Sequence, residues 1–235
     1  MIKNLAIKTA LFRIHGTLDH FLKKGIIPLS YMKNFLPENP TIVEAGAHKG
    51  KDTIKLSKTW PKGFVHAFEP VPELYTKLLT ATKKRQNVTC YPFALSDNSG
   101  KSRIFISGGI SDGSSSLLKP QEHIKIFPDV TFDEFIDVET ITLDEWAQKY
   151  SIRKVDLLWL DLQGMELNVL KSGLEILKNV RVLYTEVSLV ETYKNAPLYP
   201  EFKQWLADKG FNVQREEITG LMGNVLFVRQ NFDQK

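Results

Sequence analysis

The residues best able to do chemistry in this chain are carboxylates near the ends of apolar runs. Glu44 lies near the end of the run 41–45 and is followed by Gly46 and Gly50, and Glu69 ends a second apolar run. A strand, a glycine turn, a helix and a strand ending in an acid together form the adenosine-cofactor site of an open parallel sheet. Glycine lets the backbone approach a ligand closely. A carboxylate such as that of Glu69 can accept hydrogen bonds from both ribose hydroxyls.

The glycine spacing separates the possible cofactors. The pattern here is E-x-G-x-x-x-G. It lacks the third glycine of the dinucleotide motif and the G-K-[ST] ending of the nucleotide triphosphate motif. The pattern resembles the first motif of class I S-adenosylmethionine-dependent methyltransferases. A strand-turn-helix with two glycines can also be purely structural, and Glu69 weighs against that alternative.

The composition indicates one ordinary globular domain. The chain has 235 residues, of which 43% are hydrophobic and 25% charged, with a net charge of +4. The single cysteine, Cys90, excludes an internal disulfide framework and predicts a buried, inert thiol. No apolar stretch reaches the roughly 18 residues that span a bilayer, and no signal peptide is evident. We therefore expect a cytoplasmic protein without a transmembrane segment.

The first 36 residues are basic and have helical periodicity. Their apolar side chains are spaced three and four apart, at Leu11, Ile14, Leu18, Phe21 and Leu22. Their basic side chains are Lys3, Lys8, Arg13, Lys23, Lys24 and Lys33, against one acid, Asp19. We expect an N-terminal helical extension over 1–36 that packs on a main domain over 37–235. The alternative is a weak contact with an anionic membrane, glycan or nucleic acid, although no nucleic-acid motif is present.

Apolar runs alternate with helical patterns, which predicts a doubly wound α/β sheet. The expected strands are 41–45, 64–69, 87–93, 154–161, 181–186 and an antiparallel pair, 211–215 and 225–229. The expected helices after the extension are 51–59, 72–85, 143–150, 166–172 and 200–209. Short extra strands are expected at 102–107 and 137–141, separated by a Gly/Ser cluster at 108–116 that predicts a mobile, functional loop.

The order and spacing of several segments resemble the FkbM-type family of methyltransferases. The segments are 44–50, 67–70, 94–96, 115–117, 140–144, 155–166 and 169–173. The chain departs from the family pattern twice: Gln163 replaces the first Glu of D-x-E-G-x-E, and His48 stands where Asn is usual. The resemblance implies a seven-stranded, mostly parallel class I methyltransferase fold. It also implies methyl transfer from S-adenosylmethionine to a hydroxyl of a sugar, glycan or secondary metabolite.

The resemblance also implies a cofactor site beyond the carboxyl ends of the strands, where open α/β sheets bind ligands. The implied cofactor-binding residues are Glu44, Gly46, Ala47, Gly50, Phe68, Glu69, Pro70, Leu95, Ser96 and Asp161. The amides of 46–50 are expected to bind the methionine carboxylate, and Glu44 or Asp161 the ammonium. Phe68 and Leu95 would flank the adenine. The expected substrate-binding residues are Ser115, Ser116 and Gln163.

A sugar hydroxyl is a poor nucleophile, so a general base is expected. The candidate catalytic residues are Asp161, Glu186 and His48. Each has a plainer alternative: Asp161 and Glu186 can serve in cofactor binding, Asp161 can cap a helix, and His48 can pack on the cofactor. Glu166 and His123 are weaker candidates, as a helix cap and a surface residue. No cluster has metal-ligand spacing, so no metal is expected.

Two other functions remain open on the sequence alone. The departures at Gln163 and His48 are compatible with a noncatalytic adenosine-cofactor-binding module or partner subunit. A nicotinamide-dependent dehydrogenase is disfavoured because the third glycine is missing.

Overall fold

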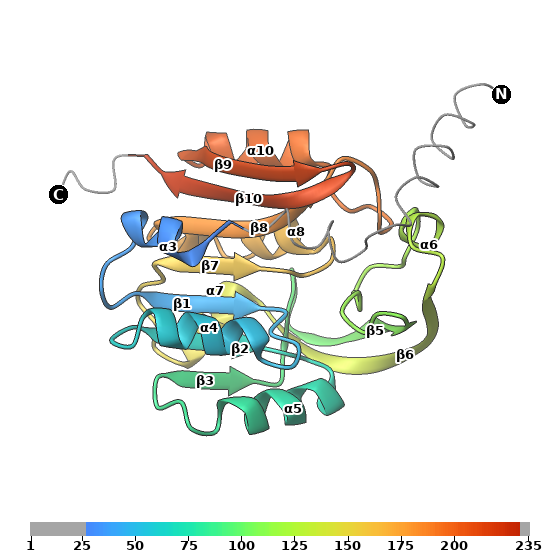
Figure 1. The fold of residues 1–235 in the computed structure, drawn as a ribbon, viewed down its shortest axis with the longest axis horizontal. Helices are drawn as coiled ribbons and strands as arrows, with labels where there is room; N and C mark the ends of the chain where they lie inside the picture. The colour runs from blue at the N-terminus through green and yellow to red at the C-terminus, as the bar shows by residue number, and fades with distance from the viewer. Residues whose placement is uncertain (1–26, 231–235) are drawn as a thin grey trace.

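A seven-stranded sheet forms the centre of the structure, a computed structural model that describes residues 27–230 (Figure 1). Its strands are β1 (Thr41–Ala45), β2 (Phe64–Phe68), β3 (Val88–Tyr91), β7 (Leu157–Leu160), β8 (Val182–Ser188), β9 (Phe211–Thr219) and β10 (Met222–Arg229). Their order across the sheet is β3-β2-β1-β7-β8-β10-β9. The first five are parallel, and β10 runs antiparallel to both neighbours. The predicted doubly wound, mostly parallel sheet is confirmed.

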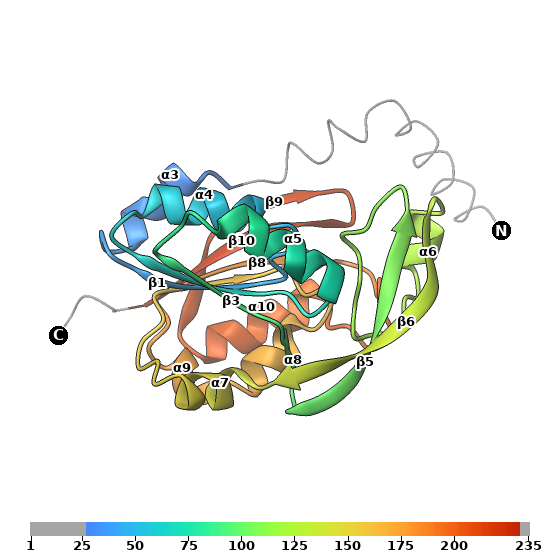
Figure 2. The same ribbon diagram turned by 90° about the horizontal axis from the view of Figure 1, so that it is seen from below.

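Helices cover both faces of this sheet (Figure 2). The helical segments are α3 (Leu29–Met32), η1 (Lys33–Phe35), α4 (Lys51–Thr59), α5 (Pro72–Thr82), α6 (His123–Ile126), α7 (Leu143–Lys149), α8 (Glu166–Lys171), α9 (Leu174–Leu177) and α10 (Tyr199–Asp208). In Figure 2, α3, α4 and α5 lie on one side of the sheet, and α7 to α10 lie on the other. Along the chain, β2 and β3 are added on one side of β1, whereas β7 is added on its other side. This reversal places the topological switch point between β1 and β7.

Strand residues alternate between the two helical layers because successive side chains point to opposite faces. Ile42 and Leu157 pack in the cluster beneath α3 and α4, whereas Val43 and Leu158 pack in the cluster beneath α7 to α10. All four side chains are completely buried. Strands apolar on both faces are what a parallel sheet between two helix layers requires.

A second, three-stranded sheet extends beyond the carboxyl ends of the main strands (Figure 1). It consists of β4 (Ala94–Leu95), β5 (Gly100–Gly109) and β6 (Val130–Ile141), in the order β4-β6-β5. The sequence predicts only short strands here, but β5 and β6 pair along most of their length. The expected loop at 108–116 is correspondingly shorter, since Gly108 and Gly109 belong to β5 and Ser116 bridges to Phe105.

Part of the expected N-terminal extension packs as core. Ile27, Met32 and Leu36 are buried against Ile42, Leu56 and neighbours on the α4 side of the sheet. Residues 1–26 of this extension lie outside the described residues.

One side chain, Trp146 on α7, holds the aromatic centre of the larger core. It is completely buried and makes edge contacts with Phe68 and Tyr91, at centroid distances of 5.2 and 5.7 Å. We expect Trp146→Ala to lower the free energy of unfolding by about 3–5 kcal/mol, because it leaves a large cavity. Urea denaturation measures this loss, with Trp205→Ala, at a half-buried position of α10, as the control. Equal losses in the two variants would contradict the assignment.

Candidate active site

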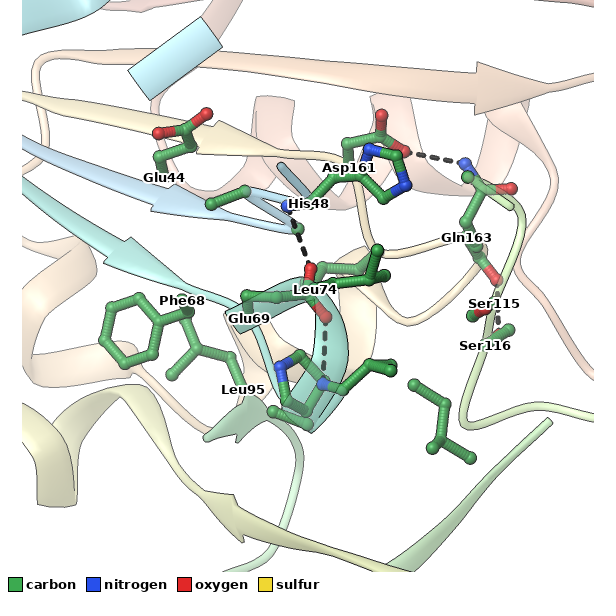
Figure 3. Close-up of a pocket in the computed structure, with 18 of the residues that line it drawn as sticks. Glu44, His48, Phe68, Glu69, Leu74, Leu95, Ser115, Ser116, Asp161 and Gln163 are labelled. Carbon is green, nitrogen blue, oxygen red and sulfur yellow. Dashed lines mark hydrogen bonds between the residues drawn. The ribbon is translucent and has the colours of Figure 1, made fainter. Parts of the chain in front are cut away.

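A cavity of about 220 Å³ opens between the carboxyl ends of the main strands and the second sheet (Figure 3). Most residues expected at the site from the sequence line it. These are Glu44, Gly46, Ala47, His48, Phe68, Glu69, Pro70, Leu95, Ser115, Ser116, Asp161 and Gln163. They come from segments far apart in the sequence, which the sheet topology brings to one edge.

Three expected site residues lie outside the wall of this cavity. Gly50, with φ +82°, begins α4, and a Cβ there would lie 2.9 Å from Leu78 Cδ1, so its role is in packing. Ser96 is buried and its hydroxyl bonds the Asp97 carboxylate at 3.1 Å. Glu186 lines a separate cavity of about 30 Å³. Their expected roles in cofactor binding and catalysis stay predictions.

Gly46 stands where two backbones meet. Its φ is +87°, and a Cβ on it would lie 2.0 Å from the carbonyl oxygen of Asp161. Only glycine adopts this conformation readily and fits this gap. The glycine loop therefore rests directly on the residue that follows β7.

Most amides of the glycine loop are already engaged within the protein. The Gly46 and Ala47 amides donate to the Phe68 carbonyl at 3.1 and 2.9 Å, the Gly50 amide donates to the Ala47 carbonyl, and the His48 amide donates to Glu69. Most of the amides expected to bind an anion across 46–50 therefore already have an acceptor within the protein. The amides of the first turn of α4 have no partner within the helix, and one of them, that of Thr53, bonds Glu44.

Glu69 is clamped by two backbone amides. Its Oε2 accepts from His48 at 2.8 Å and its Oε1 accepts from Val71 at 2.9 Å (Figure 3). Burial raises the pKa of this carboxyl to about 7, and the hydrogen bonds from the two amides oppose that rise. Each oxygen keeps a second lone pair directed away from its amide, so the carboxylate can still accept from two hydroxyls.

Glu44 lies deeper, with 2% of its surface exposed. Burial raises the pKa of its carboxyl to about 8, while Thr53 opposes the shift. Within residues 27–230 its Oε2 has no hydrogen-bond partner. A buried, unsatisfied carboxylate oxygen beside a cavity is a strong acceptor for a donor or cation that enters it.

Asp161 opens to the cavity from the tight turn between β7 and α8. The surrounding protein desolvates its carboxyl and raises its pKa, while a hydrogen bond from Gln163 Nε2 at 2.7 Å opposes the rise. The turn is closed by Glu166, whose two oxygens accept from the Leu162 and Gly164 amides at 2.8 and 3.0 Å. Glu166 is thus occupied in the turn that precedes α8, and it does not make the expected cap on the helix itself.

Two contacts at the mouth of the cavity could not be predicted from the sequence. Asp112, from the loop after β5, contacts His48 Nε2 at 3.1 Å and Lys49 Nζ at 2.5 Å. Lys49 is the main cause that lowers the pKa of Asp112. This loop is therefore tied to the glycine loop, and only the fold brings the two segments together.

His123 is enclosed away from the cavity. It is 2% exposed, its ring lies 5.0 to 5.3 Å from those of Phe127, Phe132 and Tyr193, and burial lowers its pKa to about 4. The expectation of a solvated surface histidine is wrong for this residue, because its ring packs against Phe132 of β6.

The cavity is acidic. Five carboxyl groups line it, against one lysine and one histidine: Glu44, Asp52, Glu69, Asp112 and Asp161, with Lys51 and His48. Apolar side chains also line it, among them Phe68, Leu74, Leu95, Ile104 and Leu117. Such a site suits a cationic group joined to a flat apolar one. Within residues 27–230, no three metal-ligating side chains come together as a metal site.

Comparison with known proteins places the chain in a family. The profile of the Methyltransferase FkbM domain matches residues 44–213. The chain belongs to the FkbM methyltransferase family. It is 31% identical over 161 residues to the 2-O-methyltransferase NoeI of Sinorhizobium fredii, in a match that spans 66% of each protein, just under two thirds of that relative's length.

Solved structures agree with this placement at the level of the fold. The FkbM methyltransferase of Methylobacillus flagellatus KT superposes with a TM-score of 0.56 over 87% of this chain and 48% of that one, at 14% identity. Aeropyrum pernix fibrillarin, solved with bound S-adenosyl-L-methionine, superposes with a TM-score of 0.50 over 90% and 74%, at 15% identity. The predicted family, one of methyltransferases, and the predicted fold are confirmed. No helix of this FkbM-family chain within 27–230 has the length and apolarity needed to cross a bilayer.

The contact at Gly46 gives a direct test of how the site is built. We expect Gly46→Ala to lower the free energy of unfolding by about 2 kcal/mol or more, because the new Cβ meets a carbonyl oxygen in a left-handed backbone. Gly100→Ala is the matched control: Gly100 also has positive φ, but a Cβ there has nothing within 4 Å. Chemical denaturation compares the two, and equal stability would contradict the close approach.

Proposed function

We propose that this chain transfers a methyl group from S-adenosylmethionine to a hydroxyl oxygen of a neutral small molecule or glycan. The observation that carries the proposal is the acidic cavity at the β1/β7 switch point, with the clamped carboxylate of Glu69 at the end of β2. The family match supports the methyl transfer, and fibrillarin's bound ligand supports the choice of donor.

The residues present fit this donor. The free Oε2 of Glu44 and the carboxylate of Asp161 suit the ammonium and the sulfonium charge, and Glu69 suits the two ribose hydroxyls. The apolar wall around Phe68 and Leu95 suits the adenine. When bound, the donor supplies an activated methyl group.

The protein's contribution is to hold the acceptor hydroxyl in line and to receive its proton. Holding two reactants in line lowers the barrier by about 7 kcal/mol or more in favourable cases. Asp161 is the carboxylate best placed to take the proton, because it faces the cavity from a rigid turn and burial raises its pKa, which makes it a stronger base than an exposed aspartate. His48, tied to Asp112, is the second candidate.

A neutral acceptor follows from the charge of the site. An anionic acceptor, such as a phosphate or a carboxylate, would be repelled by the carboxyl groups of the cavity that are ionised when the cationic donor is bound. The hydroxyls of Ser115 and Ser116 border the cavity and suit a polyhydroxyl partner, although Ser116 Oγ already donates to Gln163 O at 2.8 Å. The printed activity of NoeI, 2-O-methylation, agrees with a hydroxyl acceptor.

We also propose that residues 37–235 form the catalytic domain and that 1–36 add to it. A membrane-surface contact of that basic segment and a cytoplasmic location stay predictions.

Calorimetric titration tests the donor first. The purified protein is expected to bind S-adenosylhomocysteine and S-adenosylmethionine and to leave NAD unbound. Binding of NAD alone would overturn the proposal.

Glu69 provides a sharp test of the ribose contact. We expect Glu69→Ala to weaken S-adenosylhomocysteine binding at least tenfold, because hydrogen bonds to a charged group contribute about 1.5–3 kcal/mol. Glu73→Ala, on the exposed side of α5, is the control. An unchanged affinity in a folded Glu69 variant would remove this residue from the site.

Asp161 is expected to matter more for turnover than for folding. Asp161→Asn keeps the shape and removes the charge, and we expect methyl transfer to fall about a hundredfold or more. Turnover is followed as S-adenosylhomocysteine release with a sugar acceptor found by screening, with Asp208→Asn on α10 as the control. A lost ammonium contact also weakens cofactor binding, whereas a lost base does not. Wild-type turnover would exclude both roles.

A further inference from the structure

The side-chain amide of Gln163 connects Asp161 to two residues that have no role in the proposed reaction, Glu186 and Tyr193. Its Nε2 donates to Asp161 Oδ1 at 2.7 Å and to Glu186 Oε2 at 3.1 Å. Its Oε1 accepts from the Tyr193 hydroxyl at 2.9 Å. Because an amide nitrogen carries two hydrogens, this orientation supplies one donor to each of the two acids.

The same residue is also held through its backbone. Its φ is +53°, in the left-handed region, and its carbonyl oxygen accepts from Ser116 Oγ at 2.8 Å. The Tyr193 hydroxyl, whose single hydrogen is shared between two acceptors, also lies 2.7 Å from the Ser114 carbonyl oxygen. Side chain and backbone therefore link Asp161 and Glu186 to the loop that borders the cavity; Figure 3 shows the bonds of Gln163 to Asp161 and Ser116.

We propose that Gln163 is a positioning residue: a neutral double donor that fixes Asp161 against Glu186 and, with Tyr193, holds the segment 114–116 over the cavity. The role assigned to Asp161 rests on the proposed function, but the clamp itself does not. Gln163 also separates the large cavity from the small one, since its side chain lines both.

The surroundings explain why an amide suits this position. The titratable groups that face the pair are Asp52, His48, Glu166, Tyr184 and Tyr193. Three carboxyl groups, those of Asp161, Glu186 and Glu166, already lie close together. Burial and this mutual repulsion raise the pKa of Glu186 to about 8, and the bond from Gln163 opposes the rise. A carboxylate in place of Gln163 would add a further negative charge and could not donate to both acids.

This assignment predicts a defect that depends on pH. Acids whose pKa is raised on folding keep their protons in the native state, so the protein loses stability as pH rises from about 4.5 toward 8. Gln163→Glu adds a fourth such acid. We expect a melting temperature close to that of the wild type at pH 5.5 and about 4 °C or more below it at pH 8.5. A residue that only fills space would give the same loss at both pH values.

The matched control is Gln121→Glu, because Gln121 also donates to a carboxylate, Glu191 Oε2 at 2.7 Å, outside the cavity. If Gln163→Glu does not fold at one of the two pH values, Gln163→Met is measured instead. Its melting temperature is also expected to fall further below that of the wild type at pH 8.5 than at pH 5.5. This substitution removes both donor hydrogens and so also steepens the pH dependence. Equal losses at both pH values, or losses matching those of Gln121→Glu, would overturn the proposal.

The link to the loop has its own measurement. Tyr193→Phe is expected to speed hydrogen exchange of the Ser114 and Ser116 amides about fivefold or more. These amides now bond Ser107 Oγ and the Phe105 carbonyl. Tyr75→Phe, which removes a hydroxyl bonded to the Cys90 carbonyl, is the control. Unchanged exchange would remove Tyr193 from the clamp. Both readouts use the protein without cofactor, so they separate failure of this inference from failure of donor binding.

Discussion

The cavity depends on a direct approach of two backbones, the loop after β1 and the turn after β7. At their meeting point the α-carbon of Gly46 faces the carbonyl of Asp161, with no room for a side chain. The Asp161 amide also donates to the Ala45 carbonyl at 3.0 Å, which extends the β1–β7 ladder to its last residue. Because the loop and the turn are locked together here, the side chains they carry face one shared space.

Much of this arrangement follows from local sequence. Parallel strands with apolar residues on both faces must lie between helices, and residues at their carboxyl ends must share an edge. Strand patterns alone therefore predict that Glu44, Glu69 and Asp161 lie together. They also predict Glu186 at the same edge, whereas it lines a neighbouring cavity behind Gln163. Strand ends cannot predict this separation, because the intervening side chain comes from the next turn.

The rest of the site could not be predicted because it depends on contacts between distant segments. Asp112 meets His48 and Lys49 only because β5 and β6 form a long arm that returns toward the glycine loop. Tyr193 meets Ser114 only because the chain after β8 passes under that arm. Neither residue lies in a motif with recognisable spacing. The amides of the glycine loop are a further case. The glycine spacing predicts that the Gly46 and Ala47 amides bind a ligand, but both donate to the Phe68 carbonyl.

The site concentrates carboxyl groups and supplies few cations, which sets the protonation of the cavity. Burial raises the pKa of Glu44 to about 8 and that of Glu69 to about 7, so near neutral pH these groups hold protons for much of the time. A cation entering the cavity favours the ionised forms and displaces protons. The amide of Gln163 takes no part in that exchange because it does not titrate, and the Leu162 and Gly164 amides hold Glu166 in place. The turn after β7 thus keeps its shape while the acids around it change charge, and a rigid turn is what keeps Asp161 aimed at one point in the cavity.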